Sequence, residues 1–192
     1  GTTTKGTAQD NDGPMYKVFE RTLETVVDTV EFLLDNFKFV KIPYISGNHD
    51  YLISNMLDYA VQQRFCKESR VQCDVSLSAR KYYQTGNTLI GIAHGNLEKK
   101  AANTYPMTMV FENKNILDST KFYEFFLGHT HTDKETIQLI TEGVLVKVRT
   151  MPAFSPASAW SSGKTFYHQP MAQIHLYNHE RGHEASFSYL PH

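Results

Sequence analysis

The chain has 192 residues, of which 41% are hydrophobic and 12% aromatic, enough to bury the core of one globular domain. Its 19 basic and 20 acidic residues give a formal net charge of −1, which excludes a strong overall field toward nucleic acid or an anionic membrane. No apolar stretch approaches the roughly 20 residues that span a bilayer, and two cysteines make no disulfide framework, so we expect a cytoplasmic protein without a membrane partner.

The first third of the chain predicts a loop, a helix and a strand in that order. Residues 1–14 contain no large apolar side chain and are expected to form an irregular N-terminal loop. From 15 to 37, apolar residues recur at steps of three and four, which predicts an amphipathic helix. The apolar segment 37–46 is typical of a strand, and Gly47 permits a tight turn after it. A second helix is expected over 52–66.

The rest of the chain is richer in predicted strands. A Gly-Asn pair at 86 and 87 predicts a hairpin turn, and HERGH at 179–183 is expected to join a final strand pair. A mostly helical stretch is expected at 97–117. Strands are expected at 71–77, 81–85, 88–94, 121–129, 171–178 and 184–190, with two more inside 135–151. This alternation predicts one α/β domain over 1–192, a sandwich of mixed sheets flanked by helices.

Side chains that can bind metal follow three of the predicted strands. They are Asn48, His94, His129 and His131. Binding groups in layered α/β proteins collect beyond the carboxyl ends of the strands, where these side chains can converge. A single histidine there is more often structural than a ligand, but four such residues together favour a site. Imidazole nitrogens and an amide oxygen suit manganese, iron, zinc or magnesium better than a soft ion.

The GHTH stretch at 128–131 has a spacing that fits two neighbouring ions. A sharp turn can direct its two histidines toward different ions, although residues two apart on an extended segment point the same way. Two ions about 3.5–4 Å apart can polarise a phosphoryl oxygen and convert a bridging water into a hydroxide nucleophile. The pattern therefore predicts phosphoester hydrolysis.

Three short motifs, taken in order, resemble those of a known family. GNHD at 47–50, AHG at 93–95 and GHTH at 128–131 resemble the signatures of the calcineurin-like metallophosphoesterases. The first 13 residues also resemble a loop of phage-type members, which are distantly similar to the SbcD group of DNA-repair nucleases. The resemblance implies a hydrolase with two divalent ions, of which manganese is favoured and iron, zinc and magnesium are alternatives.

The resemblance also implies a role for each residue of these motifs. One ion would be held by Asn48, His94 and His129, and the other by His131. His49 would be the general acid that protonates the leaving alkoxide, a task that suits an imidazole that is not bound to metal. Asp50 would orient the ring of His49 by hydrogen bonding. The implied substrate is a phosphoester, with phosphodiesters such as DNA favoured over phosphoproteins.

Two motifs of the family are missing from the 192 residues. They are an Asp-x-His motif and a GDxxD-type segment, whose aspartate bridges both ions. We therefore expect a fragment that lacks the first strand or strands, with poorly occupied metal sites, because the bridging carboxylate lets two cations lie close together. Little or no hydrolysis is expected from this chain, and an exposed sheet edge could pair two copies into a homodimer.

Two other functions remain open at the level of sequence. The chain could be a catalytically degenerate module that binds nucleic acid or regulates a partner, or a domain stabilised by one structural zinc ion. Zinc is disfavoured because Cys66 and Cys73 are remote from the histidine motifs, and structural zinc prefers thiolates. HERGH has a zinc-like spacing, but Gly182 and the flanking strand patterns favour a hairpin whose histidines face solvent.

Overall fold

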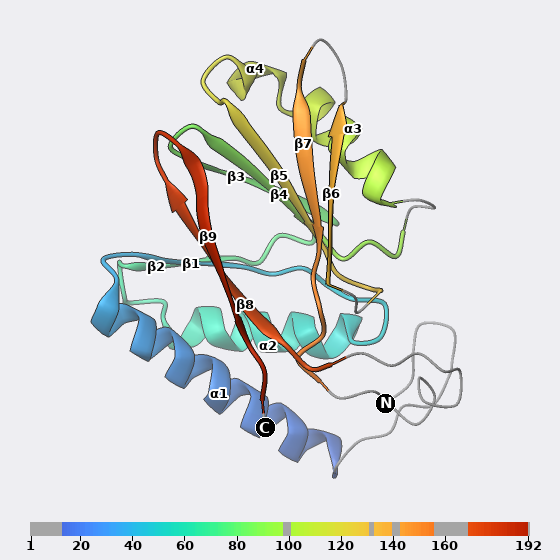
Figure 1. Cartoon of the computed structure of the whole chain (residues 1–192). Helices are drawn as coiled ribbons and strands as arrows, with labels where there is room; N and C mark the ends of the chain where they lie inside the picture. The colour runs from blue at the N-terminus through green and yellow to red at the C-terminus, as the bar shows by residue number, and fades with distance from the viewer. Residues whose placement is uncertain (1–12, 98–100, 131–132, 140–142, 156–168, 192) are drawn as a thin grey trace. The chain divides into compact units, whose positions relative to one another are not determined.

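The computed structural model describes residues 13–97, 101–130, 133–139, 143–155 and 169–191. The chain divides into two compact units, Gly1–Ala79 and Arg80–His192, and each is described by itself (Figure 1). The single domain predicted over 1–192 stays a prediction. Most of the predicted loop at 1–14 and the predicted ligand His131 lie outside the described residues.

The first unit combines two helices with two short parallel strands. The first predicted helix is confirmed, because apolar residues at helical spacing give it one continuous packing face. Its elements are α1 (Met15–Asn36), β1 (Val40–Pro43), α2 (Tyr51–Arg64) and β2 (Val71–Asp74). Both helices pack against the β1–β2 pair around a small core of Val30, Val40, Val61 and Phe65.

The first predicted strand is shorter than expected. The sequence pattern extends over 37–46, but β1 pairs with β2 over only four residues, from Val40 to Pro43. Phe39, just before the strand, is 53% exposed, so its apolar side chain adds little to the core.

The two cysteines, Cys66 and Cys73, form no disulfide bond with each other, and both are free thiols.

The second unit is built on a mixed sheet of five strands in the order β3-β4-β5-β7-β6. The three central strands β4, β5 and β7 run parallel, and the edge strands β3 and β6 are antiparallel to their neighbours. The strands are β3 (Arg80–Thr85), β4 (Thr88–Ala93), β5 (Phe122–Leu127), β6 (Lys134–Leu139) and β7 (Leu145–Thr150). The predicted mixed α/β class is confirmed.

Two different layers cover the two faces of this sheet. Alternate residues of β5 point to opposite faces, as in any strand. Phe125 packs on the helical side, where its ring stacks on Tyr105, whereas Phe126 contacts His175 of a β-hairpin on the other side. The covering elements are α3 (Ala101–Glu112) and α4 (Lys114–Leu117) on one side, and β8 (Ala172–Asn178) and β9 (Gly182–Tyr189) on the other.

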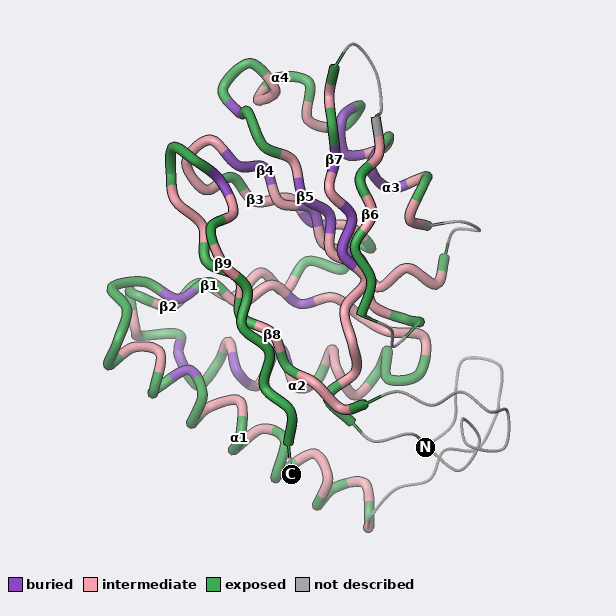
Figure 2. The backbone as a smooth tube through the Cα atoms, in the orientation of Figure 1, coloured by how far each residue is buried: buried purple, intermediate pink, exposed green. Residues whose placement is uncertain are grey.

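The main apolar core lies between the sheet and α3. Figure 2 shows the buried stretches of β4, β5 and β7 beside buried residues of α3, while the hairpin is mostly exposed or half-buried. The core consists of Leu89, Ala93, Tyr105, Met109, Val110, Phe125, Leu127, Val146 and Val148. The helical stretch predicted at 97–117 is divided, because α3 ends at Glu112 and α4 begins at Lys114. Within the described residues, no helix has the length and apolar character needed to cross a bilayer.

Candidate functional site

Two of the predicted metal ligands lie side by side in the second unit. The parallel register pairs Ala93 at the end of β4 with Leu127 at the end of β5, so both loops leave the same edge of the sheet. His94 follows immediately, and His129 follows after Gly128. The ring centroids of the two histidines are 5.2 Å apart, with an angle of 69° between the ring planes. The sheet topology therefore brings together two imidazoles that are 35 positions apart in the sequence.

The loop after β5 has an unusual backbone at His129. Among the described residues, His129 is the only one other than glycine with a positive φ, at +65°. The Gly128 amide donates to the His94 carbonyl oxygen at 3.1 Å, and the Thr130 amide donates to the Gly128 carbonyl oxygen at 2.8 Å. A left-handed conformation costs about 1–2 kcal/mol, and such strain often occurs at functional sites. Whether this turn directs the two histidines of GHTH toward different ions stays a prediction, because His131 lies outside the described residues.

Both rings of this pair lie near the surface of their unit. His94 is half-buried and His129 is exposed. At Gly128 an added Cβ would lie 3.4 Å from Nδ1 of His94, so a side chain there would contact the ring. The loop after β5 therefore packs directly against the His94 ring.

The GNHD loop lies in the first unit, between β1 and α2. Asp50 holds it closed, because its Oδ1 accepts the Gly47 amide at 3.0 Å and its Oδ2 accepts the Ser54 hydroxyl at 2.6 Å. Asn48 is half-buried and His49 is exposed. Asp50 thus fixes the loop that carries both residues and ties it to the first turn of α2. The predicted orientation of the His49 ring by Asp50 stays a prediction.

The four predicted metal ligands differ in what the structure says of them. His94 and His129 are adjacent, Asn48 belongs to the other unit, and His131 lies outside the described residues. Within the described part of the chain, no group of three His, Cys, Asp or Glu side chains could hold a metal ion. The convergence of all four ligands stays a prediction, and so do the metal ions themselves.

A second polar cluster lies under the β8–β9 hairpin, where the sequence predicted solvent-exposed histidines. The hairpin itself is confirmed, but His183 belongs to β9 and is half-buried, so its assignment to solvent is wrong. His175 Nδ1 and His183 Nε2 each lie 2.9 Å from the Ser186 hydroxyl oxygen. Burial lowers the pKa of both histidines, and the charge of Arg149 lowers that of His175 further.

A buried ion pair on the sheet supports this cluster. Glu124 of β5 is 4% exposed, and its Oε2 accepts the Arg149 Nε at 2.9 Å and the Tyr177 hydroxyl at 2.9 Å. Arg149 also donates from Nη1 to Glu135. Burial, with the nearby Glu124 charge, raises the pKa of Tyr177 well above its ordinary value. The hairpin is therefore attached to the sheet by polar side chains.

An inverted strand pattern explains why sequence reasoning missed this cluster. Gln173, His175 and Tyr177 of β8 are half-buried, whereas Ile174 and Leu176 between them are 63% and 46% exposed. The alternation with period two is present in the sequence, but the usual rule assigns the apolar residues to the inside. The alternation of polar and apolar residues along β8 was the signal in the sequence that one face of this strand is polar.

The chain was compared with protein-family models, curated proteins and solved structures, and none of them matches it. The resemblance to the calcineurin-like metallophosphoesterases therefore stays a prediction. It depends on three sequence motifs, GNHD, AHG and GHTH.

Proposed function

We propose that the chain carries part of the centre of a dinuclear-metal phosphoesterase, acting on phosphodiesters such as DNA. The observation that carries the proposal is the pair His94 and His129, with ring centroids 5.2 Å apart beyond two parallel strands. The left-handed backbone of His129 supports it, because a strained turn in a histidine-rich loop needs a functional reason. A structural role for two surface imidazoles would not require that strain.

The proposed ligand set has the chemistry of a borderline divalent ion. Asn48, His94 and His129 would hold one ion and His131 the other, with manganese favoured over iron, zinc or magnesium. When bound, such ions polarise a phosphoryl oxygen and make a hydroxide nucleophile available near neutral pH. The neutral imidazoles and the amide contribute no negative charge, so these ligands alone bind cations weakly. We therefore expect little hydrolysis without a bridging carboxylate.

The GNHD loop would supply the proton for the leaving group. His49 is exposed and therefore accessible to a substrate oxygen. Asp50 keeps the loop closed through Gly47 and Ser54, which fixes the backbone on either side of His49. An imidazole that is not bound to metal can donate the proton that the leaving alkoxide accepts.

The proposal extends to the fold. A metallophosphoesterase-like sandwich consists of mixed sheets flanked by helices, with the active loops beyond the carboxyl ends of parallel strands. Parallel strands are present in both units, and the motif loops follow β1, β4 and β5. This arrangement supports the finer fold assignment, which otherwise depends on the motifs.

Metal binding provides the first test. Calorimetric titration of the chain with MnCl₂ should give a measurable affinity that falls at least about tenfold in His94→Ala and in His129→Ala. His179→Ala is the matched control, because it removes an exposed imidazole from the hairpin turn of the same unit. Equal affinities in all four proteins would refute the proposed ligands, provided that circular dichroism shows each variant folded.

Turnover provides the second test. With excess MnCl₂ and a chromogenic phosphodiester, we expect slow hydrolysis that His49→Ala removes and His179→Ala leaves unchanged. Hydrolysis that survives His49→Ala would contradict the role of His49 as proton donor. Fast hydrolysis by the unaltered chain would contradict the inference that the missing carboxylate limits metal binding.

A further inference from the structure

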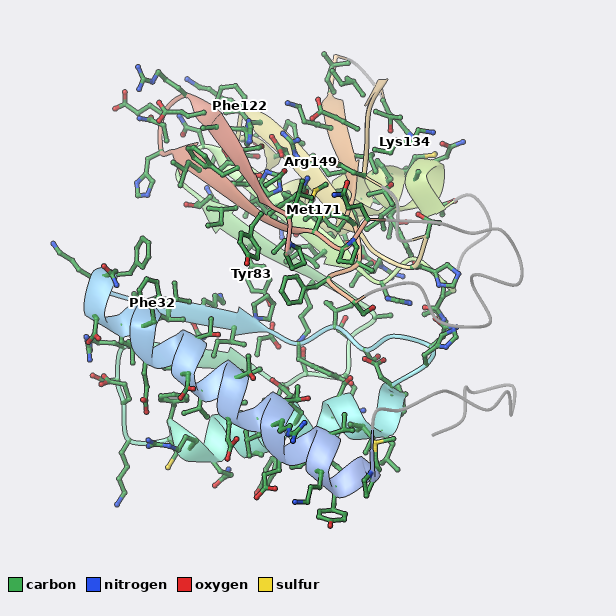
Figure 3. The ribbon with its side chains drawn as sticks, turned by 60° about the horizontal axis from the view of Figure 1, so that its bottom comes forward. Phe32, Tyr83, Phe122, Lys134, Arg149 and Met171 are labelled. Carbon is green, nitrogen blue, oxygen red and sulfur yellow. The ribbon has the colours of Figure 1, made fainter. Side chains whose placement is uncertain are left out.

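A pocket of about 370 Å³ lies between the β6–β7 strands and the β8–β9 hairpin. Arg149 and Lys134, labelled in Figure 3, belong to this region of the second unit. Each described residue that lines the pocket is polar or charged, among them Lys147, His175 and Ser186. Its volume falls within the range of about 300–1,000 Å³ that is typical of small-molecule sites. A lining of polar side chains indicates a polar ligand.

Two buried nitrogens at this pocket have no hydrogen-bond partner among the described residues. They are Nη2 of Arg149 and Nε2 of His175. The other nitrogens of these groups are used, since Arg149 donates to Glu124 and Glu135, and His175 Nδ1 pairs with Ser186. An unpaired buried polar group destabilises the fold unless something supplies the missing bond. Both nitrogens lie below the accessible surface of the pocket, so a ligand oxygen would accept from them only after the Arg149 and His175 side chains turn toward it, with His175 in its Nε2–H tautomer.

Carboxylates balance the cations around the pocket once Glu124, the buried partner of Arg149, is counted, so Lys134 and Lys147 are the cations that would face an anion. Lys134, Lys147 and Arg149 line the pocket together with two carboxylates, those of Asp133 and Glu135. Glu135 lies 3.5 Å from the Lys147 ammonium and also accepts from Arg149, so its charge is already shared between two cations. An anion would also favour protonation of the nearby histidines, whose pKa values are lowered in its absence.

We propose that this pocket binds a phosphate group, with Arg149, Lys147 and His175 as its hydrogen-bond donors. A guanidinium nitrogen, an ammonium and an imidazole are the donors that proteins commonly use for phosphate oxygens. The pocket is distinct from the His94–His129 pair, and phosphate binding here needs no metal ion.

The position of the pocket suggests why it would exist. Lys134 pairs with Thr150 at the end of β7, the strand beside β5, so the pocket begins at the same sheet edge as the His129 loop. A nucleic-acid strand at the metal centre could therefore place a neighbouring phosphate in the pocket. This substrate role rests on the proposed function, whereas binding of a phosphate ion does not.

Nuclear magnetic resonance of the metal-free chain tests the site directly. In the presence of EDTA and at constant ionic strength, inorganic phosphate should shift the imidazole signals of His175 and His183 saturably and raise the pKa of His175. His179, on the hairpin turn, should not respond. Absence of saturable shifts at His175 and His183 would overturn the proposal.

Substitution locates the bound phosphate. Lys147→Gln should weaken phosphate binding about tenfold, because a charge-assisted hydrogen bond is lost. Lys114→Gln is the matched control, since it removes the same charge from α4, and its affinity should be unchanged. Arg149→Lys should weaken binding further, but Arg149 also holds Glu124, so Lys147→Gln keeps the test independent of folding. Equal affinities in Lys147→Gln and the unaltered chain would overturn the assignment.

The source of the phosphate is decided by competition. A single-stranded oligodeoxynucleotide without terminal phosphates should displace inorganic phosphate if the pocket holds a backbone phosphate. Failure to displace it would overturn the substrate role and identify free phosphate as the ligand. Repeating the phosphate titration with His94→Ala should give an unchanged affinity, which separates this site from any failure of the metal centre.

Discussion

The two faces of the five-stranded sheet are covered in opposite ways. On one face, Phe125 is fully buried, its ring stacked 5.5 Å from Tyr105 and edge-on to Tyr82 at 6.3 Å. On the other face, the preceding residue Glu124 is buried in an ion pair with Arg149 under the hairpin. Neighbouring residues of one strand thus serve an apolar core and a polar network.

The contrast between the apolar and the polar face indicates that the two faces of one sheet contribute differently to stability and to ligand binding. An apolar face contributes to stability through buried area, without regard to direction. A buried ion pair contributes less, because the desolvation of two charges offsets much of their attraction, but it fixes donors and acceptors in direction. The helical face is therefore expected to stabilise the unit, and the hairpin face to present polar groups to a ligand.

The largest predicted effect compares two adjacent phenylalanines. Phe125→Ala should lower the free energy of unfolding of the second unit by about 4 kcal/mol, because it leaves a cavity in the apolar core. Phe126→Ala removes the same side chain from the hairpin face, where Phe126 is half-buried, and should cost about half as much. Urea unfolding measures both, and equal losses would contradict the contrast between the faces.

A smaller effect should follow from detaching the hairpin. Gly182 has a φ of +77°, and an added Cβ would lie 2.7 Å from the Phe122 ring, so Gly182→Ala combines backbone strain with a clash. Gly143 has a φ of +87° with nothing within 4 Å, so Gly143→Ala adds strain alone. We expect the free energy of unfolding to fall by about 3 kcal/mol in Gly182→Ala and by about 1 kcal/mol in Gly143→Ala. Urea unfolding measures both losses, and equal losses in the two variants would show that the hairpin is not docked on Phe122.

The smallest predicted effect is a pH dependence of the hairpin face. The folded pKa of His175 is lowered from 6.5, so the unfolded chain binds more protons as the pH falls. The stability that the neutral His175 ring contributes is complete above pH 6.5, and it is lost as the pH falls through the folded pKa of His175. Unfolding followed between neutral and mildly acidic pH should show a shallower loss in His175→Gln than in His179→Gln. The same slope in both variants would contradict the burial of His175.

Much of the fold could be predicted from sequence because local periodicity determines it. The long helix α1 follows apolar residues at helical spacing, and the turn at Gly86 and Asn87 joins β3 to β4 as predicted. The order of strands could not be predicted, because β7 lies between β5 and β6 and such pairing depends on contacts between distant segments. The β8–β9 hairpin was predicted, but not which of its faces lies inward, since its inner face is polar.

The candidate site was predictable only in part. His94 and His129 each follow the end of an apolar strand, a local signal, and parallel pairing then brought them together. The phosphate pocket has no local signal, because Lys134 and Lys147 lie on the consecutive strands β6 and β7, whereas His175 comes from the later strand β8. Its donors became visible only when the unpaired nitrogens were located in three dimensions.

We propose that Asn48 and the His94–His129 pair bind a shared metal ion. Paramagnetic broadening of amide signals by substoichiometric Mn²⁺ tests it most directly. The account predicts that Asn48 in the first unit and His94 and His129 in the second lose intensity at the same Mn²⁺ concentration, and that Asn48→Ala weakens the effect in the second unit. Broadening confined to one unit, or unaffected by Asn48→Ala, would contradict it.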